Sequence, residues 1–150
     1  GASRAVLVAL EDLGFTSIFL ANRTKERAEN LAQILSTPKC RVSVVAWEQV
    51  ARALKDATLL VNATSLGMAG QPSLDLSLDA LSSSASVADI VYAPVETALL
   101  KRAKQRGLRS IDGLGMLLHQ ARPAFKAFFG HDPEVTQELR DFVLGRREKT

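Results

Sequence analysis

A chain of 150 residues, of which 47% are hydrophobic and 23% charged, is long enough for one domain with its own core. The net charge of +3 is too small to predict a nucleic-acid partner. The single cysteine, Cys40, excludes an internal disulfide and is typical of a cytoplasmic protein, and no apolar run reaches the roughly 18 residues of a membrane span. Neither His119 nor His131 has companions at metal-ligand spacing, so we expect no metal site.

In the first half of the chain, helix and strand patterns alternate. Gly1 begins a helix that extends to Leu13, and Ser17–Ala21 is a short strand. Thr24 is the expected N-cap of a second helix, which ends at Ser36-Thr37-Pro38. The pattern then predicts three further elements: a strand at 41–46, a short helix at 47–54, and a strand covered on both faces at 59–62.

The second half begins with a long irregular stretch. Residues 69–86 are rich in Gly, Pro, Ser and Asp, which predicts a loop. The pattern then predicts a strand at 87–91, a helix at 97–106 and a strand at 109–111. A long apolar helix follows Asp112, and Pro123 predicts a kink or a break within it. The pair Asp132-Pro133 predicts the N-terminus of a final helix.

This alternation predicts an α/β fold, a Rossmann-like, doubly wound and mostly parallel sheet with helices on both faces. Gly1-Ala2-Ser3 matches the tail of a glycine-rich loop, but the strand that normally precedes such a loop is missing. In the usual strand order, 3-2-1-4-5-6, that first strand is central, so the second and third strands have no partner that joins them to the fourth. We therefore expect an N-terminally truncated fragment of a longer protein.

The residues after the strand at 17–21 predict the cofactor. In nucleotide-binding βαβ units, the residue about 20 positions past the glycines contacts the adenosine ribose. An acid there binds the 2′-hydroxyl of NAD, whereas an arginine suits the 2′-phosphate of NADP. This chain has Asn22-Arg23 at that place, with Lys25 and Arg27 nearby. The sequence therefore predicts NADP, although the basic run alone is also compatible with a solvated helix face.

Five segments, in order along the chain, carry a resemblance to one known family. They are Gly1–Val6, Asn22–Thr24 with Arg27-Ala28, Val61–Met68, Asp89–Tyr92, and Asp112–Leu117 with Gln120. On these segments the chain resembles the C-terminal, NADP-binding half of the shikimate dehydrogenase family. Each segment alone is a weak signal, but together they cover nearly the whole chain at compatible spacing.

The resemblance implies where ligands bind. Gly1, Ala2 and Ser3 would lie beside the cofactor pyrophosphate at a helix N-terminus. The residues expected to hold the ribose and its 2′-phosphate are Asn22, Arg23, Thr24 and Arg27. The residues expected at the nicotinamide end are Thr64, Ser65, Ile90 and Gly113, and those expected to hydrogen-bond the substrate are Tyr92 and Gln120.

The resemblance also implies the reaction, a reversible NADPH-dependent reduction of 3-dehydroshikimate to shikimate. In this family a Lys and Asp pair in the N-terminal half assists proton transfer, so we expect no catalytic residue here and no activity from the fragment alone. Residues 1–112 would form the truncated NADP-binding domain. Residues 113–150 would form helices that complete it and pack toward the absent catalytic half.

The sequence leaves several alternatives open. The nucleotide domain of glutamyl-tRNA reductase has a similar glycine helix and Asn-Arg-Thr segment, but it does not account for Gln120 or for residues 112–116. A non-catalytic regulator that senses NADP or a quinate-like ligand is compatible with Tyr92 and Gln120. Shikimate and quinate both remain possible substrates, and a homodimer remains one of the open oligomeric states.

Overall fold

The computed structural model describes residues 1–146 and contains two parallel sheets flanked by helices. In the first sheet, β1 (Ser17–Leu20) pairs with β2 (Arg41–Val44). The second sheet has the order β3-β4-β5 and consists of β3 (Leu59–Asn62), β4 (Ser86–Asp89) and β5 (Arg109–Ile111). All pairs are parallel, which confirms the predicted α/β fold class.

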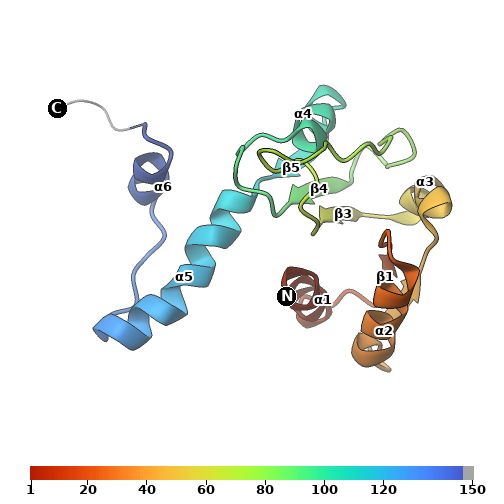
Figure 1. Ribbon diagram of the computed structural model, residues 1–150, viewed down its shortest axis with the longest axis horizontal. Helices are drawn as coiled ribbons and strands as arrows, with labels where there is room; N and C mark the ends of the chain where they lie inside the picture. The colour runs from red at the N-terminus through yellow and green to blue at the C-terminus, as the bar shows by residue number, and fades with distance from the viewer. Residues whose placement is uncertain (147–150) are drawn as a thin grey trace.

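The helices join the strands in chain order (Figure 1). In the first half they are α1 (Ala2–Asp12), α2 (Lys25–Leu35) and a short segment of η1 (Trp47–Gln49), α3 (Val50–Ala53) and η2 (Leu54–Asp56). In the second half they are α4 (Ala98–Gln105), α5 (Gly113–Phe129) and α6 (Gln137–Val143). Most of these bounds lie within two or three residues of the predicted ones.

The two sheets are not hydrogen-bonded to each other in the part of the chain that the structure describes. Residues of β1 and β3 line the same cavity, so the gap lies between these two strands. A doubly wound sheet whose central strand is absent has this arrangement. The prediction that residues 59–62 are covered on both faces is wrong for most of the strand, because Leu59, Leu60 and Val61 are only partly buried.

Each sheet packs against its own core. A small cluster of buried residues, Leu7, Ala32 and Val42, joins α1 and α2 to the two-stranded sheet. A larger cluster surrounds the three-stranded sheet and includes Val87, Leu99 and Leu108. The part of the fold around β3, β4 and β5 is therefore the better packed of the two.

Two predictions about the C-terminal helices need correction. Pro123 predicted a kink or a break; α5 is one helix through Pro123, so the break does not occur. The proline removes one N–H from the helix, and the carbonyl four residues earlier, which loses this bond, belongs to the exposed residue His119. Asp132 does not cap α6, because its carboxylate accepts a hydrogen bond from Arg122 on α5 at 3.0 Å. The N-cap is Thr136, whose hydroxyl accepts the N–H of Leu139 at 3.1 Å.

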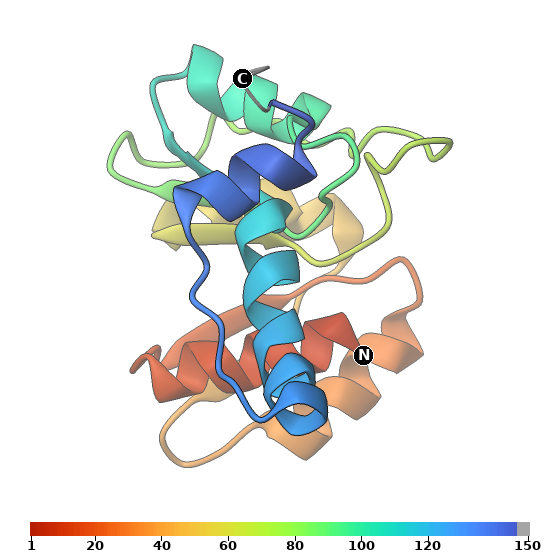
Figure 2. The same ribbon diagram turned by 90° about the vertical axis from the view of Figure 1, so that its left-hand side faces the viewer.

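α5 projects away from the three-stranded sheet (Figure 1), and in Figure 2 it extends to the level of α1 and α2. An ion pair between Arg140 and Asp112 ties α6 to the start of α5. The far end of α5 carries large apolar side chains in solvent, since Phe128 is 83% and Phe129 70% exposed. The proposed division at residue 112 remains a prediction, and its last residues, 147–150, lie outside the described part of the chain.

Candidate functional site

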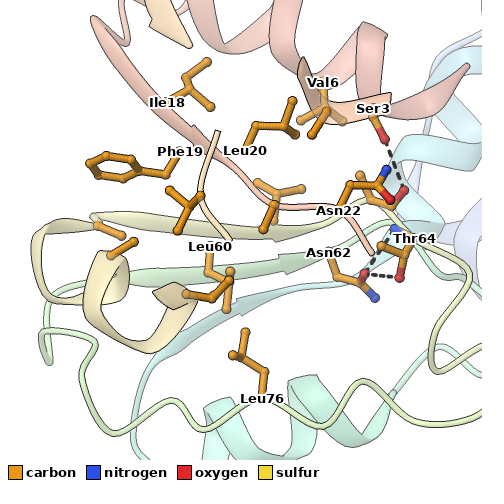
Figure 3. Close-up of a pocket in the computed structure, with 18 of the residues that line it drawn as sticks. Ser3, Val6, Ile18, Phe19, Leu20, Asn22, Leu60, Asn62, Thr64 and Leu76 are labelled. Atoms are coloured by element: carbon orange, nitrogen blue, oxygen red, sulfur yellow. Dashed lines mark hydrogen bonds between the residues drawn. The ribbon is translucent and has the colours of Figure 1, made fainter. Parts of the chain in front are cut away.

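A cavity of about 1250 Å³ lies between the two sheets. Its walls come from α1, β1, the start of α2, and β3 with the loop that follows (Figure 3). Six of the residues predicted to bind the cofactor line it: Ser3, Asn22, Arg23, Arg27, Thr64 and Ser65. The fold thus brings together side chains from three distant segments that the resemblance assigns to one ligand.

The polar residues of this cavity gather where β1 and β3 end. Asn22 follows β1, and Asn62 is the last residue of β3. Ser3 on α1 links the two sides, since its hydroxyl donates to the carbonyl of Ala63 at 3.4 Å (Figure 3). Carboxyl ends of parallel strands are the usual ligand-binding edge of open α/β sheets. Away from this edge most of the lining residues are apolar, with Ile18 and Leu60 among them.

The basic side chains after β1 are available to an anion. The carboxamide oxygen of Asn22 accepts the N–H of Thr24 at 2.9 Å, which shapes the turn before α2. Arg23 and Arg27 are exposed on the cavity wall, and neither forms an ion pair within residues 1–146. Lys25, in contrast, pairs with Glu29 at 3.4 Å. Two unpaired guanidinium groups suit a phosphate group, so these residues fit the predicted NADP.

α1 begins beside this edge of the cavity. Gly1 is its N-cap, and no side chain caps the helix. N–H groups of the first turn have no partner inside a helix and favour a negatively charged group. Of the three residues predicted near the pyrophosphate, Ser3 lines the cavity, whereas Gly1 and Ala2 are exposed outside its lining.

Thr64 and Ser65 differ in what they offer to a ligand. The Thr64 hydroxyl donates to the carboxamide oxygen of Asn62 at 2.8 Å and accepts the N–H of Leu66 at 3.0 Å. Its proton is therefore used inside the loop. The exposed Ser65 hydroxyl has no hydrogen-bond partner among residues 1–146, so it is the donor of this pair that a ligand can use.

Ile90 and Gly113, the other two residues predicted at the nicotinamide end, are in direct contact. A β carbon on Gly113 would lie 2.3 Å from the carbonyl oxygen of Ile90 and 2.6 Å from that of Val91. Only glycine fits such a close backbone approach. Neither residue lines the cavity. Of the four residues predicted at the nicotinamide end, only Thr64 and Ser65 therefore belong to its wall.

The two predicted substrate residues lie outside the cavity. Tyr92 is on the loop after β4 and is 43% exposed. Gln120 is on α5, and its side chain is exposed. Within residues 1–146, both side chains face solvent, and their contact with a substrate remains a prediction.

Sequence reasoning assigned no functional role to three buried polar residues behind these loops. Asn62, Asp89 and Thr97 are only 3%, 2% and 1% exposed, and they form one hydrogen-bonded group. Asp89 ends β4 and Thr97 is the N-cap of α4. The available signal was the polar residue at the end of each apolar strand, since a buried polar group needs partners.

Neither a metal site nor a membrane-spanning helix is present among residues 1–146. No group of three or more His, Cys, Asp or Glu side chains within residues 1–146 is placed to hold a metal ion. In the same residues, every helix is too short or too polar to cross a membrane. The buried Cys40 precedes β2 and does not line the cavity.

Comparisons with known proteins agree with this geometry. Residues 113–137 match a family model described as the Shikimate 5′-dehydrogenase C-terminal domain. Over 144 residues the chain is 54% identical to a protein of Azorhizobium caulinodans named shikimate dehydrogenase (NADP(+)). That match covers 96% of this chain and 50% of the relative.

Solved structures of a quinate dehydrogenase and of a shikimate dehydrogenase share the fold. Quinate dehydrogenase from Corynebacterium glutamicum in complex with NAD matches with a TM-score of 0.86 and 32% identity, over 96% of this chain and 52% of that one. Shikimate 5-dehydrogenase from Thermus thermophilus in complex with NADP(H) and shikimate matches with a TM-score of 0.70 and 32% identity, over 87% and 46%. The chain thus spans about half the length of the relatives that it matches. In sequence and in fold, the chain is similar to the C-terminal half of proteins named shikimate dehydrogenase.

Proposed function

We propose that this chain is the NADP-binding half of a shikimate dehydrogenase, which reduces 3-dehydroshikimate reversibly to shikimate. The observation that carries the proposal is the cavity at the ends of β1 and β3. It has two unpaired arginines, Arg23 and Arg27, on one side and the loop of Ser65 on the other. The name of the Azorhizobium caulinodans relative, a shikimate dehydrogenase (NADP(+)), supports the same cofactor.

In this proposal the chain binds and orients the cofactor. Arg23 and Arg27 hold the 2′-phosphate, and the first turn of α1 with Ser3 binds the pyrophosphate. The Ser65 hydroxyl and the contact of Ile90 with Gly113 shape the nicotinamide end. When NADPH is bound, it supplies the hydride for the substrate carbonyl. We assign the proton transfer to the other half of the enzyme, because none of these residues is placed as its acid or base.

The substrate side of the site needs a second domain. Tyr92 and Gln120 face solvent and are available to a ligand held between two domains. The exposed phenylalanines at the end of α5 give the absent half an apolar surface to cover. This supports the division of the chain at residue 112, with 113–150 packing toward the catalytic half in a cytoplasmic enzyme. A homodimer remains a further proposal.

The test is an enzyme assay on a fusion protein. Residues 1–150 are joined to the part of the Azorhizobium caulinodans relative that lies outside the matched half, and the intact relative is the positive control. We expect the fusion to oxidise shikimate with NADP as acceptor, and to use NAD and quinate less well. The quinate arm is included because a quinate dehydrogenase with NAD shares the fold at 32% identity.

Two results would contradict the proposal. A fusion that melts cooperatively and binds NADP, but oxidises neither shikimate nor quinate, would favour the non-catalytic regulator. A fusion that turns over quinate with NAD faster than shikimate with NADP would assign both the wrong substrate and the wrong cofactor.

A further inference from the structure

We propose that Asp89 is a positioning residue, which holds the two loops at the nicotinamide and substrate ends of the site in one fixed arrangement. The proposal rests on the proposed function, because it concerns how that site is aligned. Its starting point is a buried carboxylate that takes no part in the ligand contacts described above. Asp89 is 2% exposed at the carboxyl end of β4, between the loop of Thr64 and the loop of Tyr92.

Asp89 accepts three hydrogen bonds from three different parts of the chain. Its Oδ1 atom accepts Nδ2 of Asn62 and the backbone N–H of Val91, both at 3.0 Å. Its Oδ2 atom accepts the hydroxyl of Thr97 at 2.7 Å. All three partners are donors, and a carboxylate is the side chain that can accept from all of them at once. The contacts connect β3, the loop after β4 and the start of α4.

Asn62 extends this group into the loop that lines the cavity. Its Nδ2 atom donates to Asp89 and also to the carbonyl of Leu66, at 3.0 Å each. Its Oδ1 atom accepts the N–H and the hydroxyl of Thr64, at 3.1 and 2.8 Å. The carboxamide thus uses both N–H groups and both lone pairs, which fixes its orientation. Asn62 is bound to Asp89 and itself holds both Thr64 and Leu66. The path of the loop on either side of Ser65 therefore depends on the position of Asp89.

The other side of the group reaches the substrate end. Val91, whose N–H is bound to Asp89, lies between Ile90 and Tyr92, and its carbonyl contacts Gly113 at the start of α5. The two loops also meet directly, since the N–H of Ala69 donates to the carbonyl of Ala93 at 2.8 Å. A shift of Asp89 would therefore move Tyr92 relative to Ser65. Small changes in the alignment of reacting groups have large effects on turnover.

A merely structural role for this group would have a different signature. Thr97 also caps α4, because its hydroxyl accepts the N–H of Leu100 at 3.3 Å. Loss of that cap alone would lower the melting temperature and leave the kinetic constants of the folded enzyme unchanged. Arg23 is in the turn between β1 and α2, and no hydrogen bond within residues 1–146 links it to the group. The preference for NADP over NAD should therefore not change if Asp89 only aligns the two loops.

The experiment compares four single variants of the fusion protein and the double variant that combines Asp89→Asn with Thr97→Val. Asp89→Asn keeps the shape of the side chain and the α4 cap, but places an N–H group opposite a donor. Thr97→Val removes the hydroxyl, whereas Thr97→Ser keeps it. Leu108→Ala is the matched control, because Leu108 is a core residue of the same sheet outside the group and the cavity. For each variant we measure the melting temperature, kcat and KM for shikimate, the Kd for NADP and NAD, and hydrogen exchange of residues 62–68 without cofactor.

We expect Asp89→Asn and Thr97→Val each to lower kcat/KM at least about tenfold, with the ratio of Kd for NADP and NAD unchanged. Their combination should cost less than the product of the two effects, because they break one connected group. Exchange of residues 62–68 should become faster in both. Thr97→Ser and Leu108→Ala should stay within about twofold of the parent in kcat/KM.

The proposal is wrong if Asp89→Asn leaves kcat/KM and the exchange of residues 62–68 unchanged. It is also wrong if Leu108→Ala, at an equal loss of melting temperature, lowers kcat/KM as much as Asp89→Asn does. If Asp89→Asn does not melt cooperatively, the comparison of Thr97→Val with Thr97→Ser replaces it. Equal kcat/KM and equal exchange of residues 62–68 in these two variants would then show that the proposal is wrong. An inactive parent fusion would instead count against the proposed function, so the two failures are distinguishable.

Discussion

The carbonyl oxygen of Ile90 lies so close to Gly113 that a β carbon on the glycine would stand 2.3 Å from it. The N-terminus of α5 therefore rests directly on the backbone of the loop that leads to Tyr92. Through this contact, the position of the long C-terminal helix and the position of the predicted substrate residue depend on each other.

The variant Gly113→Ala should disturb both elements. One of the two backbones has to move, and overpacking of this kind costs about 1–3 kcal/mol. We expect a lower melting temperature and a lower kcat/KM for shikimate in the fusion protein. Gly115→Ala is the matched control, because a β carbon there meets nothing within 4 Å. Equal effects of the two variants would show that the contact with Ile90 does not constrain the site.

Gln120 is predicted to contact the substrate and not the cofactor. Gln120→Ala in the fusion should therefore raise KM for shikimate and leave the Kd for NADP nearly unchanged, because the lost hydrogen bond acts on one ligand only. His119→Ala, at the exposed neighbouring position, is the control. If Kd for NADP rises as much as KM for shikimate, Gln120 has been assigned the wrong ligand.

The gap between the sheets predicts that residues 1–150 do not fold when expressed alone. The carbonyls of Thr16 and Leu20 bond to β2, so the backbone groups of Phe19, which point the opposite way, face the gap. The carbonyl of Asn62 accepts the N–H of Ile90, the residue after β4, so the backbone groups of Val61 face the gap from the other side. Two unpaired strand edges are a large cost for a fold that is stable by only about 5–15 kcal/mol. A cooperative thermal melt of the isolated chain would contradict this prediction.

The reactivity of Cys40 gives a second readout of the same state. Burial raises the pKa of this thiol, and the nearby Glu11 carboxylate adds to the shift. Since the thiolate is the reactive form, Cys40 in a folded domain should react slowly with a thiol reagent at neutral pH, and faster as the pH rises toward the raised pKa. In the isolated chain we expect Cys40 to react with the reagent as fast as it does in a control sample unfolded by denaturant. A rate many times slower would indicate a folded chain.

Local patterns were sufficient to predict most of the fold. The apolar run at 59–62 and the alternation at 41–46 needed no tertiary information, and Gly1, Thr24 and Thr97 were found at helix starts as expected. The start of α6 was wrong because Asp132 had a competing partner, Arg122, which is ten residues away and on another helix. Cap residues are predictable only when no such tertiary contact binds them first.

The candidate site was predictable to a similar degree. The distance from the glycines predicted Arg23, and the resemblance to a known family implied Ser3 and Ser65. The fold places all three around one cavity. The link between Asp89 and Asn62 was not predictable, because it joins two strands 27 residues apart. The surroundings of Gln120 were not predictable either, since a helix face is buried only if another element covers it.

Binding of NADP through Arg23 can be measured directly as the Kd of one variant for two cofactors. Arg23→Ala should weaken the binding of NADP by the fusion about tenfold or more, since a charge-assisted contact with phosphate contributes roughly 1.5–3 kcal/mol. The Kd for NAD should hardly change. Lys25→Ala is the control, because Lys25 is paired with Glu29 and lies outside the cavity.

We therefore expect that Arg23→Ala loses most of the preference for NADP, whereas Lys25→Ala keeps it. Isothermal titration of both variants and the parent with each cofactor measures this directly. Equal weakening of NADP and NAD binding in Arg23→Ala, or an unchanged Kd for both, would contradict the proposal that Arg23 binds the 2′-phosphate of NADP.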